Sequence, residues 1–149
     1  MKVIATNKHA YFEYDIKDKF DAGIVLQGSE VKSIRNGSVS LNGSFIQIVQ
    51  GECYLKNAFI KNYEKTSLFI PLERQPRKLL LHKNEIIKLF KAVGEKGMTI
   101  VPLKVYFDNK NRVKIEMALG KGKKIYDKRE TLKQRDLKRE SMRELKTVL

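Results

Sequence analysis

Alternating apolar and polar positions predict short β-strands through most of the first 119 residues. The clearest example is residues 112–119, in which every second side chain is apolar, namely Val113, Ile115 and Met117. Side chains of a strand point to opposite faces with a period of two, so this pattern places one face against a core and the other in solvent. The segment therefore predicts a half-buried strand.

Five further segments have the composition of strands, namely residues 11–16, 20–27, 45–49, 53–55 and 99–107. Short turns at residues 50–52 and 108–111 join two pairs of these segments into predicted hairpins. About six hairpin-linked strands in one small domain can remove their exposed edges by closing. We therefore expect a closed antiparallel β-barrel.

Two segments have helical character. Residues 30–35 predict a short helix with Ser29 as its N-cap. A second helix is predicted to begin at residues 82–84 and to end at Gly94 or Gly97. Its apolar residues recur at intervals of three and four, namely Ile86, Ile87, Leu89, Phe90 and Val93. The predicted fold class is thus mainly β with short helices.

Charge changes the picture at the C-terminal end. The 149 residues include 31 Lys and Arg against 17 Asp and Glu, a net charge of +14. Residues 120–149 hold 11 of the basic side chains, 5 acidic ones and a single aromatic residue, Tyr126. Such a segment buries too little apolar surface to offset its ordering entropy. We expect residues 1–119 to form the barrel and residues 120–149 a basic tail, disordered when free and helical when bound.

Several protein classes are disfavoured. The longest apolar stretches, such as residues 22–26, are too short to span a bilayer. The N-terminus lacks the apolar core of a signal peptide. Cys53 is the single cysteine, so no internal disulfide forms, which suits a reducing compartment. We expect a cytoplasmic protein with no membrane partner.

Candidate catalytic groups are few. The two histidines are His9 and His82, and Cys53 lies on a predicted strand, where a small core hydrophobe is expected. Four carboxylates that cluster in the sequence could gather a divalent ion, namely Glu13, Asp15, Asp18 and Asp21. Alternating solvent-facing charges explain them equally well. We predict a protein that is not an enzyme and uses no catalytic residue, metal or cofactor, with a metal-dependent nuclease as the alternative.

Basic side chains gather in three places. Lys32 and Arg35 lie three residues apart on the predicted short helix and so point to the same side. Arg74, Arg77 and Lys78 precede a run of three leucines. The third cluster consists of Lys121, Lys123, Lys124, Lys128 and Arg129. Together with the net charge, these clusters predict a nucleic-acid partner.

Several short motifs occur in order between residues 7 and 129. They are residues 7–10 (NKHA) with Tyr14, 20–28 (FDAGIVLQG), 30–35 (EVKSIR), 77–81 (RKLLL) followed by Glu85 and Ile86, 120–124 (GKGKK), and 127–129 (DKR). An ordered set of this kind is far more specific than any one short match. It resembles the SmpB family of SsrA-binding proteins.

This resemblance implies an oligonucleotide-binding (OB) fold that binds the tRNA-like domain of tmRNA, the SsrA RNA. It implies a role in trans-translation, the rescue of bacterial ribosomes stalled on messages that lack a stop codon. The body would stand in for the missing anticodon arm at the decoding centre of the small subunit, and the tail would fold as a helix in the empty mRNA channel. Elongation factor Tu would take part through tmRNA, and the protein would act as a monomer.

The motifs and basic clusters together assign candidate site residues. The tmRNA-binding side would comprise Asn7, Lys8, Asp21, Ala22, Gly23, Lys32, Arg35, Arg77, Lys78, Leu80 and His82. The ribosome-binding tail would comprise Lys121, Gly122, Lys123, Lys124, Tyr126, Asp127, Lys128 and Arg129. Strand alternation turns Leu80 outward if Leu79 and Leu81 are buried.

Two alternatives stay open at this point. The Asp21 carboxylate is expected to accept hydrogen bonds from a base edge or from a nearby Arg, which would give selectivity, or it ends a strand turn and contacts only water. The whole protein could instead be a ribosomal or initiation-type barrel that binds ribosomal RNA directly, since such a protein shares the predicted fold and charge.

Overall fold

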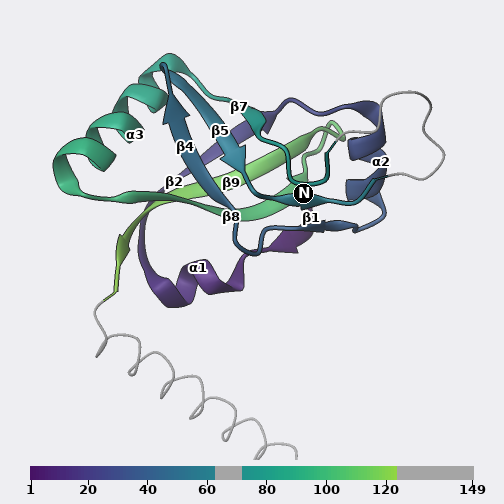
Figure 1. The fold of residues 1–149 in the computed structure, drawn as a ribbon, viewed down its shortest axis with the longest axis horizontal. Helices are drawn as coiled ribbons and strands as arrows, with labels where there is room; N and C mark the ends of the chain where they lie inside the picture. Colours follow the sequence, from purple (N-terminus) through teal and green to yellow (C-terminus); the bar gives the residue numbers. More distant parts are fainter. Residues whose placement is uncertain (63–71, 124–149) are drawn as a thin grey trace, which may run out of the picture.

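The computed structural model describes residues 1–62 and 72–123. Antiparallel strands dominate this part of the chain (Figure 1). The strands are β1 (Lys2–Thr6), β2 (Tyr14–Ile24), β3 (Val39–Ser40), β4 (Phe45–Val49), β5 (Glu52–Lys56), β6 (Phe59–Ile60), β7 (Arg77–Leu80), β8 (Thr99–Phe107) and β9 (Val113–Gly122). The helices are α1 (Lys8–Glu13), α2 (Gly28–Arg35) and α3 (Lys83–Lys96). The mainly β fold with short helices is therefore confirmed.

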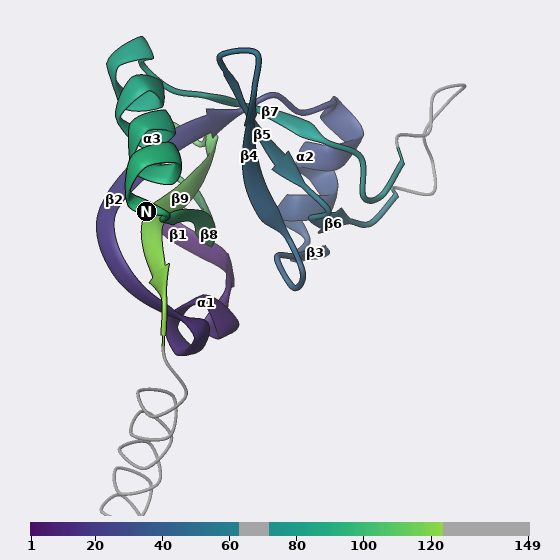
Figure 2. The same cartoon turned by 60° about the vertical axis from the view of Figure 1, so that its left-hand side comes forward.

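Seven strands form one sheet in the order β1-β8-β9-β2-β7-β5-β4, and β3 pairs with β6 in a small second sheet. The long strand β2 joins two halves, because it pairs with β9 along most of its length and with β7 only at Gly23 and Ile24. Figure 2 shows β4, β5 and β7 beside the half that contains β8 and β9. Strand β4 also contacts β8, so the sheet curves back over itself.

The main sheet has seven strands, whereas six were expected. The two strands expected at residues 11–16 and 20–27 are parts of the single strand β2. The sequence reasoning missed β1, at residues 2–6, and β7, at residues 77–80. Strand β7 follows a proline-containing loop and has only four residues, too few to display a period of two convincingly. Both predicted hairpins are confirmed, since β4 pairs with β5 and β8 pairs with β9.

The expected strand at residues 11–16 is wrong in its first half. Helix α1 occupies this segment up to Glu13, and β2 begins at Tyr14. On the outer face of the sheet α1 contributes Ala10 to a small apolar cluster, whose other buried members are Val101, Leu103 and Ala118. A six-residue helix is stabilised by such tertiary contacts, which local aromatic composition does not reveal.

Helix α2 is confirmed, but its N-cap is Gln27, not Ser29. The Glu30 carboxylate accepts a hydrogen bond from the Gln27 backbone N–H at 3.0 Å. This is the reciprocal half of a capping box, and it satisfies a donor that the first helical turn leaves unpaired.

Helix α3 begins after His82 and ends at Gly97, whose φ of +61° is the left-handed conformation typical of a helix end. The Glu85 carboxylate accepts from the His82 backbone N–H at 3.1 Å. Leu89 and Ala92 are its buried side chains, whereas the predicted apolar positions Ile87, Phe90 and Val93 are exposed. The helical spacing was correct, although only part of the apolar surface faces the core.

The main core lies between the two halves of the sheet. Its fully buried side chains include Ile34, Leu55, Leu79, Leu89, Ile115 and Met117. Cys53 is fully buried in this cluster, which confirms its prediction as a core residue, and burial raises the pKa of its thiol to about 11.

Strand β9 continues to Gly122, three residues beyond the boundary expected after residue 119. Gly120 is buried and lies opposite Ile16 on β2 and Thr99 on β8. A Cβ atom at this position would lie 2.9 Å from the Tyr14 Cβ, so the close approach of β2 requires glycine here. Within the described ranges, no helix has the length and apolarity to cross a membrane.

Candidate nucleic-acid interface

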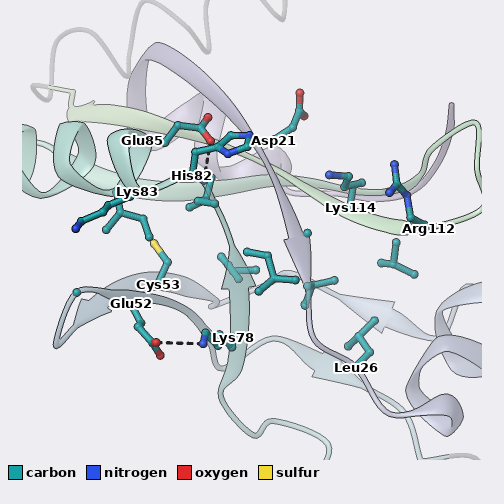
Figure 3. Close-up of a pocket in the computed structure, with 18 of the residues that line it drawn as sticks. Asp21, Leu26, Glu52, Cys53, Lys78, His82, Lys83, Glu85, Arg112 and Lys114 are labelled. Carbon is teal, nitrogen blue, oxygen red and sulfur yellow. Dashed lines mark hydrogen bonds and ion pairs between the residues drawn. The ribbon is translucent and has the colours of Figure 1, made fainter.

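A groove of about 910 Å³ opens where β2 meets β7, between the start of α3 and the β8–β9 turn (Figure 3). It brings together five of the predicted tmRNA-binding residues, namely Asp21, Gly23, Lys78, Leu80 and His82. These residues come from two segments of the chain that are distant in sequence, residues 21–23 and 78–82. We call this feature the β2–β7 groove.

Strand register explains why these segments meet. Gly23 lies opposite Leu80 on β7 and opposite Lys114 on β9. Strand β2 therefore stands between the two partners, and side chains from all three strands reach the same surface. His82 lies two residues after the end of β7 and caps α3, so the ring lies at the rim of the groove.

Leu80 is the apolar part of the groove surface. It is 53% exposed, whereas Leu79 is buried and Leu81 is half-buried, so the predicted outward orientation of Leu80 is confirmed. A Cβ atom on Gly23 would lie 3.3 Å from the Leu80 Cβ. The absence of a side chain at Gly23 thus leaves room for Leu80 to lie across β2.

Asp21 is exposed and has a protein partner. The Tyr106 hydroxyl donates a hydrogen bond to Asp21 Oδ1 at 2.9 Å. Burial of Tyr106, together with the neighbouring Asp21 carboxylate, raises the tyrosine pKa to about 12. The donor expected from the sequence was an Arg or a base edge; the donor within the protein is this tyrosine.

The charges of the groove are mixed. Lys78 pairs with Glu52 at 3.1 Å, and Arg112 pairs with Asp108 at 3.0 Å.

The sequence reasoning missed four residues that line the groove or lie beside it, namely Lys83, Tyr106, Arg112 and Lys114. Lys114 was detectable in principle, because it is a polar position of the alternating strand 112–119, but its place beside Asp21 depends on strand order.

Three of the predicted tmRNA-binding residues are buried in the structure. The Arg77 guanidinium lies 2.6 Å from Glu30 Oε2 and donates to the Ala58 carbonyl at 2.8 Å. Asn7 donates to the Pro102 carbonyl at 2.9 Å, and Ala22 is fully buried. These three side chains are enclosed by the protein and lie apart from the exposed surface of the groove.

The remaining predicted residues of the tmRNA side lie away from the β2–β7 groove. Lys8 is exposed on α1, and Lys32 is exposed on α2. The guanidinium carbon of Arg35 lies 5.8 Å from the centre of the Phe107 ring, beside a smaller pocket that Met1 and Lys2 also line. These basic residues therefore do not form one surface with Asp21 and Leu80.

Only part of the predicted tail site is described. Lys121 and Gly122 are in β9, and the Lys123 ammonium donates to the Tyr11 carbonyl at 3.1 Å. The other predicted residues lie outside the described residues, namely Lys124, Tyr126, Asp127, Lys128 and Arg129.

Three of the four carboxylates of the nuclease alternative have separate partners. Asp15 pairs with Lys17 at 2.9 Å, which lowers the pKa of the carboxyl, and Asp18 pairs with Lys88 at 3.3 Å. Asp21 accepts from Tyr106. In residues 1–62 and 72–123 no three His, Cys, Asp or Glu side chains are grouped closely enough to hold a metal ion.

Comparison with known proteins gives the family. The model of the SmpB protein family matches residues 4–147. The SsrA-binding protein of Helicobacter hepaticus is 52% identical over 148 residues, which cover 99% of this chain and 96% of that protein. The SsrA-binding protein of Persephonella marina is 53% identical over 146 residues, covering 98% and 95% of the two chains. A chain of the solved structure described as "tmRNA-SmpB: a journey to the center of the bacterial ribosome" is 45% identical with a TM-score of 0.66, over 80% of this chain and 84% of that one. The protein belongs to the SmpB family.

Proposed function

We propose that this protein binds tmRNA and acts with it on stalled ribosomes in trans-translation. The observation that carries the proposal is the match to SsrA-binding proteins over nearly the whole chain. Membership of the SmpB family also favours an RNA-binding protein over an enzyme.

The β2–β7 groove is our proposed contact for the tRNA-like domain. A folded tRNA elbow presents phosphates, 2′-hydroxyls and unpaired loop bases, which are recognised by shape and by exposed side chains. The groove offers each matching chemistry, because Lys83 and Lys114 carry positive charge, Leu80 offers an apolar surface and Asp21 offers an acceptor. Direct RNA contact is therefore proposed for Asp21, Lys78, Leu80 and His82, and a positioning role for Asn7, Ala22 and Arg77.

We also propose the finer features that the resemblance implies. The body would be a closed barrel of OB type, for which the contact between β4 and β8 is supporting geometry. It would act as a monomer in the cytoplasm, stand in for an anticodon arm at the decoding centre, and meet elongation factor Tu only through tmRNA. The basic residues beyond β9 would form the ribosome-binding tail in the mRNA channel.

A gel-shift titration tests the central proposal. The full chain is titrated against the tRNA-like domain of tmRNA, with ordinary tRNA as competitor. We expect a clear preference for the tRNA-like domain and a steep loss of affinity with salt, since six to ten phosphate contacts would cost roughly 10³–10⁵-fold between about 50 and 200 mM. Equal competition by ordinary tRNA would contradict the proposal.

Two controls separate the alternatives. Sequencing of RNA recovered with the protein should show enrichment of tmRNA, whereas bulk ribosomal RNA alone would favour a ribosomal or initiation-type barrel. Labelled RNA incubated with magnesium, with and without a chelator, should remain intact. Cleavage that depends on magnesium would support the nuclease alternative instead.

A further inference from the structure

One hydrogen bond connects the buried body to the exposed carboxylate of the β2–β7 groove. Tyr106 on β8 donates to Asp21 on β2 across the intervening strand β9, between residues 85 positions apart in the chain. Tyr106 lies opposite Lys114 of β9, and Asp21 lies opposite Glu116. The bond therefore crosses β9 diagonally, between two neighbouring outward positions of that strand.

The two partners differ strongly in burial. Tyr106 is 7% exposed, whereas Asp21 is exposed to solvent at the groove. A tyrosine side chain has only two torsions that place its ring, and close packing around a buried ring restricts both of them. The exposed carboxylate is thus held by a buried side chain.

The bond uses only one carboxylate oxygen. The Tyr106 hydroxyl donates to Oδ1, and within the described part of the chain no hydrogen bond to Oδ2 is found. An ionised carboxylate has two oxygens that each accept more than one hydrogen bond, so Oδ2 keeps its capacity for a ligand. The raised pKa of Tyr106 keeps its hydroxyl protonated across neutral pH, so it remains a donor.

We infer that Tyr106 is a positioning residue of the RNA interface, whose hydroxyl fixes the Asp21 carboxylate so that its second oxygen accepts a hydrogen bond from the RNA. This inference rests on the proposed function. An unrestrained aspartate would lose side-chain freedom when it binds, and fixing it beforehand lowers that entropic cost. A carboxylate repels phosphate and accepts hydrogen bonds from base N–H or ribose O–H groups. The fixed Asp21 carboxylate therefore contributes to selectivity between RNAs.

Tyr106→Phe tests the inference, because it retains the buried ring and removes the donor. Tyr54→Phe is the matched control. The Tyr54 hydroxyl also donates to a carboxylate, Glu52 Oε2 at 3.0 Å, but Glu52 stays anchored by Lys78 at 3.1 Å. Each variant of the full chain is titrated with the tRNA-like domain of tmRNA, at a temperature where thermal unfolding shows it to be fully folded.

We expect Tyr106→Phe to raise the Kd about three- to tenfold, the range that one hydrogen bond commonly contributes, and Tyr54→Phe to raise it less than twofold. The slope of affinity against salt should stay unchanged, because no phosphate contact is removed. In an Asp21→Ala background, Tyr106→Phe should have no further effect, a coupling that general destabilisation of the sheet would not produce.

Unchanged affinity of Tyr106→Phe would overturn the inference, as would an equal loss in the Asp21→Ala background. Either result leaves the proposed function standing, provided that the parent chain prefers the tRNA-like domain over ordinary tRNA. If the parent shows no such preference, the proposed function itself fails.

Discussion

Arg77 and Lys78 are neighbours in the chain, yet β7 gives them opposite surroundings. The Arg77 side chain is 1% exposed and pairs with an equally buried Glu30, whereas Lys78 and its partner Glu52 are each more than 40% exposed. Alternation along a strand turns successive side chains to opposite faces, so one cation stabilises the interior and the other remains available at the surface. The RKLLL motif thus contains both structural and surface positions.

Replacing Arg77 should destabilise the fold. Arg77→Met leaves the Glu30 carboxylate buried without its partner, which we expect to cost about 3–5 kcal/mol in the free energy of unfolding. Lys78→Met, one residue away, should cost less than about 1 kcal/mol, since its ion pair is exposed to solvent. Urea unfolding of the two variants measures the difference, and equal losses would contradict the assignment of Arg77 to the interior.

Cys53 should report on opening of the core. With a pKa of about 11, only about 0.1% of the thiol is ionised at pH 8, and the side chain is enclosed. We expect a thiol reagent at pH 8 to leave the folded protein unmodified for long periods and to react promptly in denaturant. Rapid modification of the folded protein would show that the two halves of the sheet separate easily.

At the scale of elements, β9 shows how a segment typical of a flexible hinge becomes a strand. Gly120 and Gly122 flank Lys121, a composition that favours a loop, but β2 and β8 provide partners for the backbone. Pairing of backbone groups outweighs the low strand propensity of glycine. The close approach of Tyr14 to Gly120 explains why the small residue is needed there.

The two glycines of β9 give a matched pair of substitutions. Gly120→Ala places a Cβ atom 2.9 Å from Tyr14 Cβ, so β2 must shift, and we expect a loss of about 1–3 kcal/mol in stability. At Gly122 no atom lies within 4 Å of such a Cβ, and Gly122→Ala should change stability by less than about 0.5 kcal/mol. Thermal and urea unfolding test both, and a tolerant Gly120 would argue against the observed pairing.

At the scale of the whole molecule, basic side chains continue beyond the end of β9. Residues 124–149 contain nine Lys and Arg against five Asp and Glu, so they add to the positive charge of the protein. RNA recognition and ribosome engagement are therefore separable in our proposal, because the β2–β7 groove lies entirely within residues 21–114.

Truncation separates these two functions. A chain that ends at Lys123 retains β9, so it should fold, bind the tRNA-like domain with little loss and fail to support peptide tagging on stalled ribosomes. A chain that ends at Leu119 loses the pairing of Gly120 with Ile16 and Thr99, and its midpoint of thermal unfolding should fall. Peptide tagging by the chain that ends at Lys123 would contradict the proposed role of the tail.

Local pattern was sufficient for much of the architecture. The hairpin at residues 45–56 follows from a short turn that contains Gly51 between two apolar runs, and the end of α3 follows from a glycine after a helical period. In the structure both Gln50 and Gly51 have positive φ, as the turn requires. Such features depend on neighbours within a few residues. The failures arose where distant contacts decide, as in α1, which forms because Ala10 finds apolar partners on β8 and β9.

The sequence by itself determined the family, the predominance of antiparallel strands, the two long hairpins and the outward orientation of Leu80. These follow from an ordered set of motifs and from periods that act over short distances. Only the tertiary structure decided that Arg77 is interior, that Asp21 meets Tyr106, and that Lys114 joins Leu80 in one groove. Each of these depends on the order and register in which β7, β2, β9 and β8 pair, and hydrogen bonds between strands so far apart in the chain leave no local signature in the residues that make them.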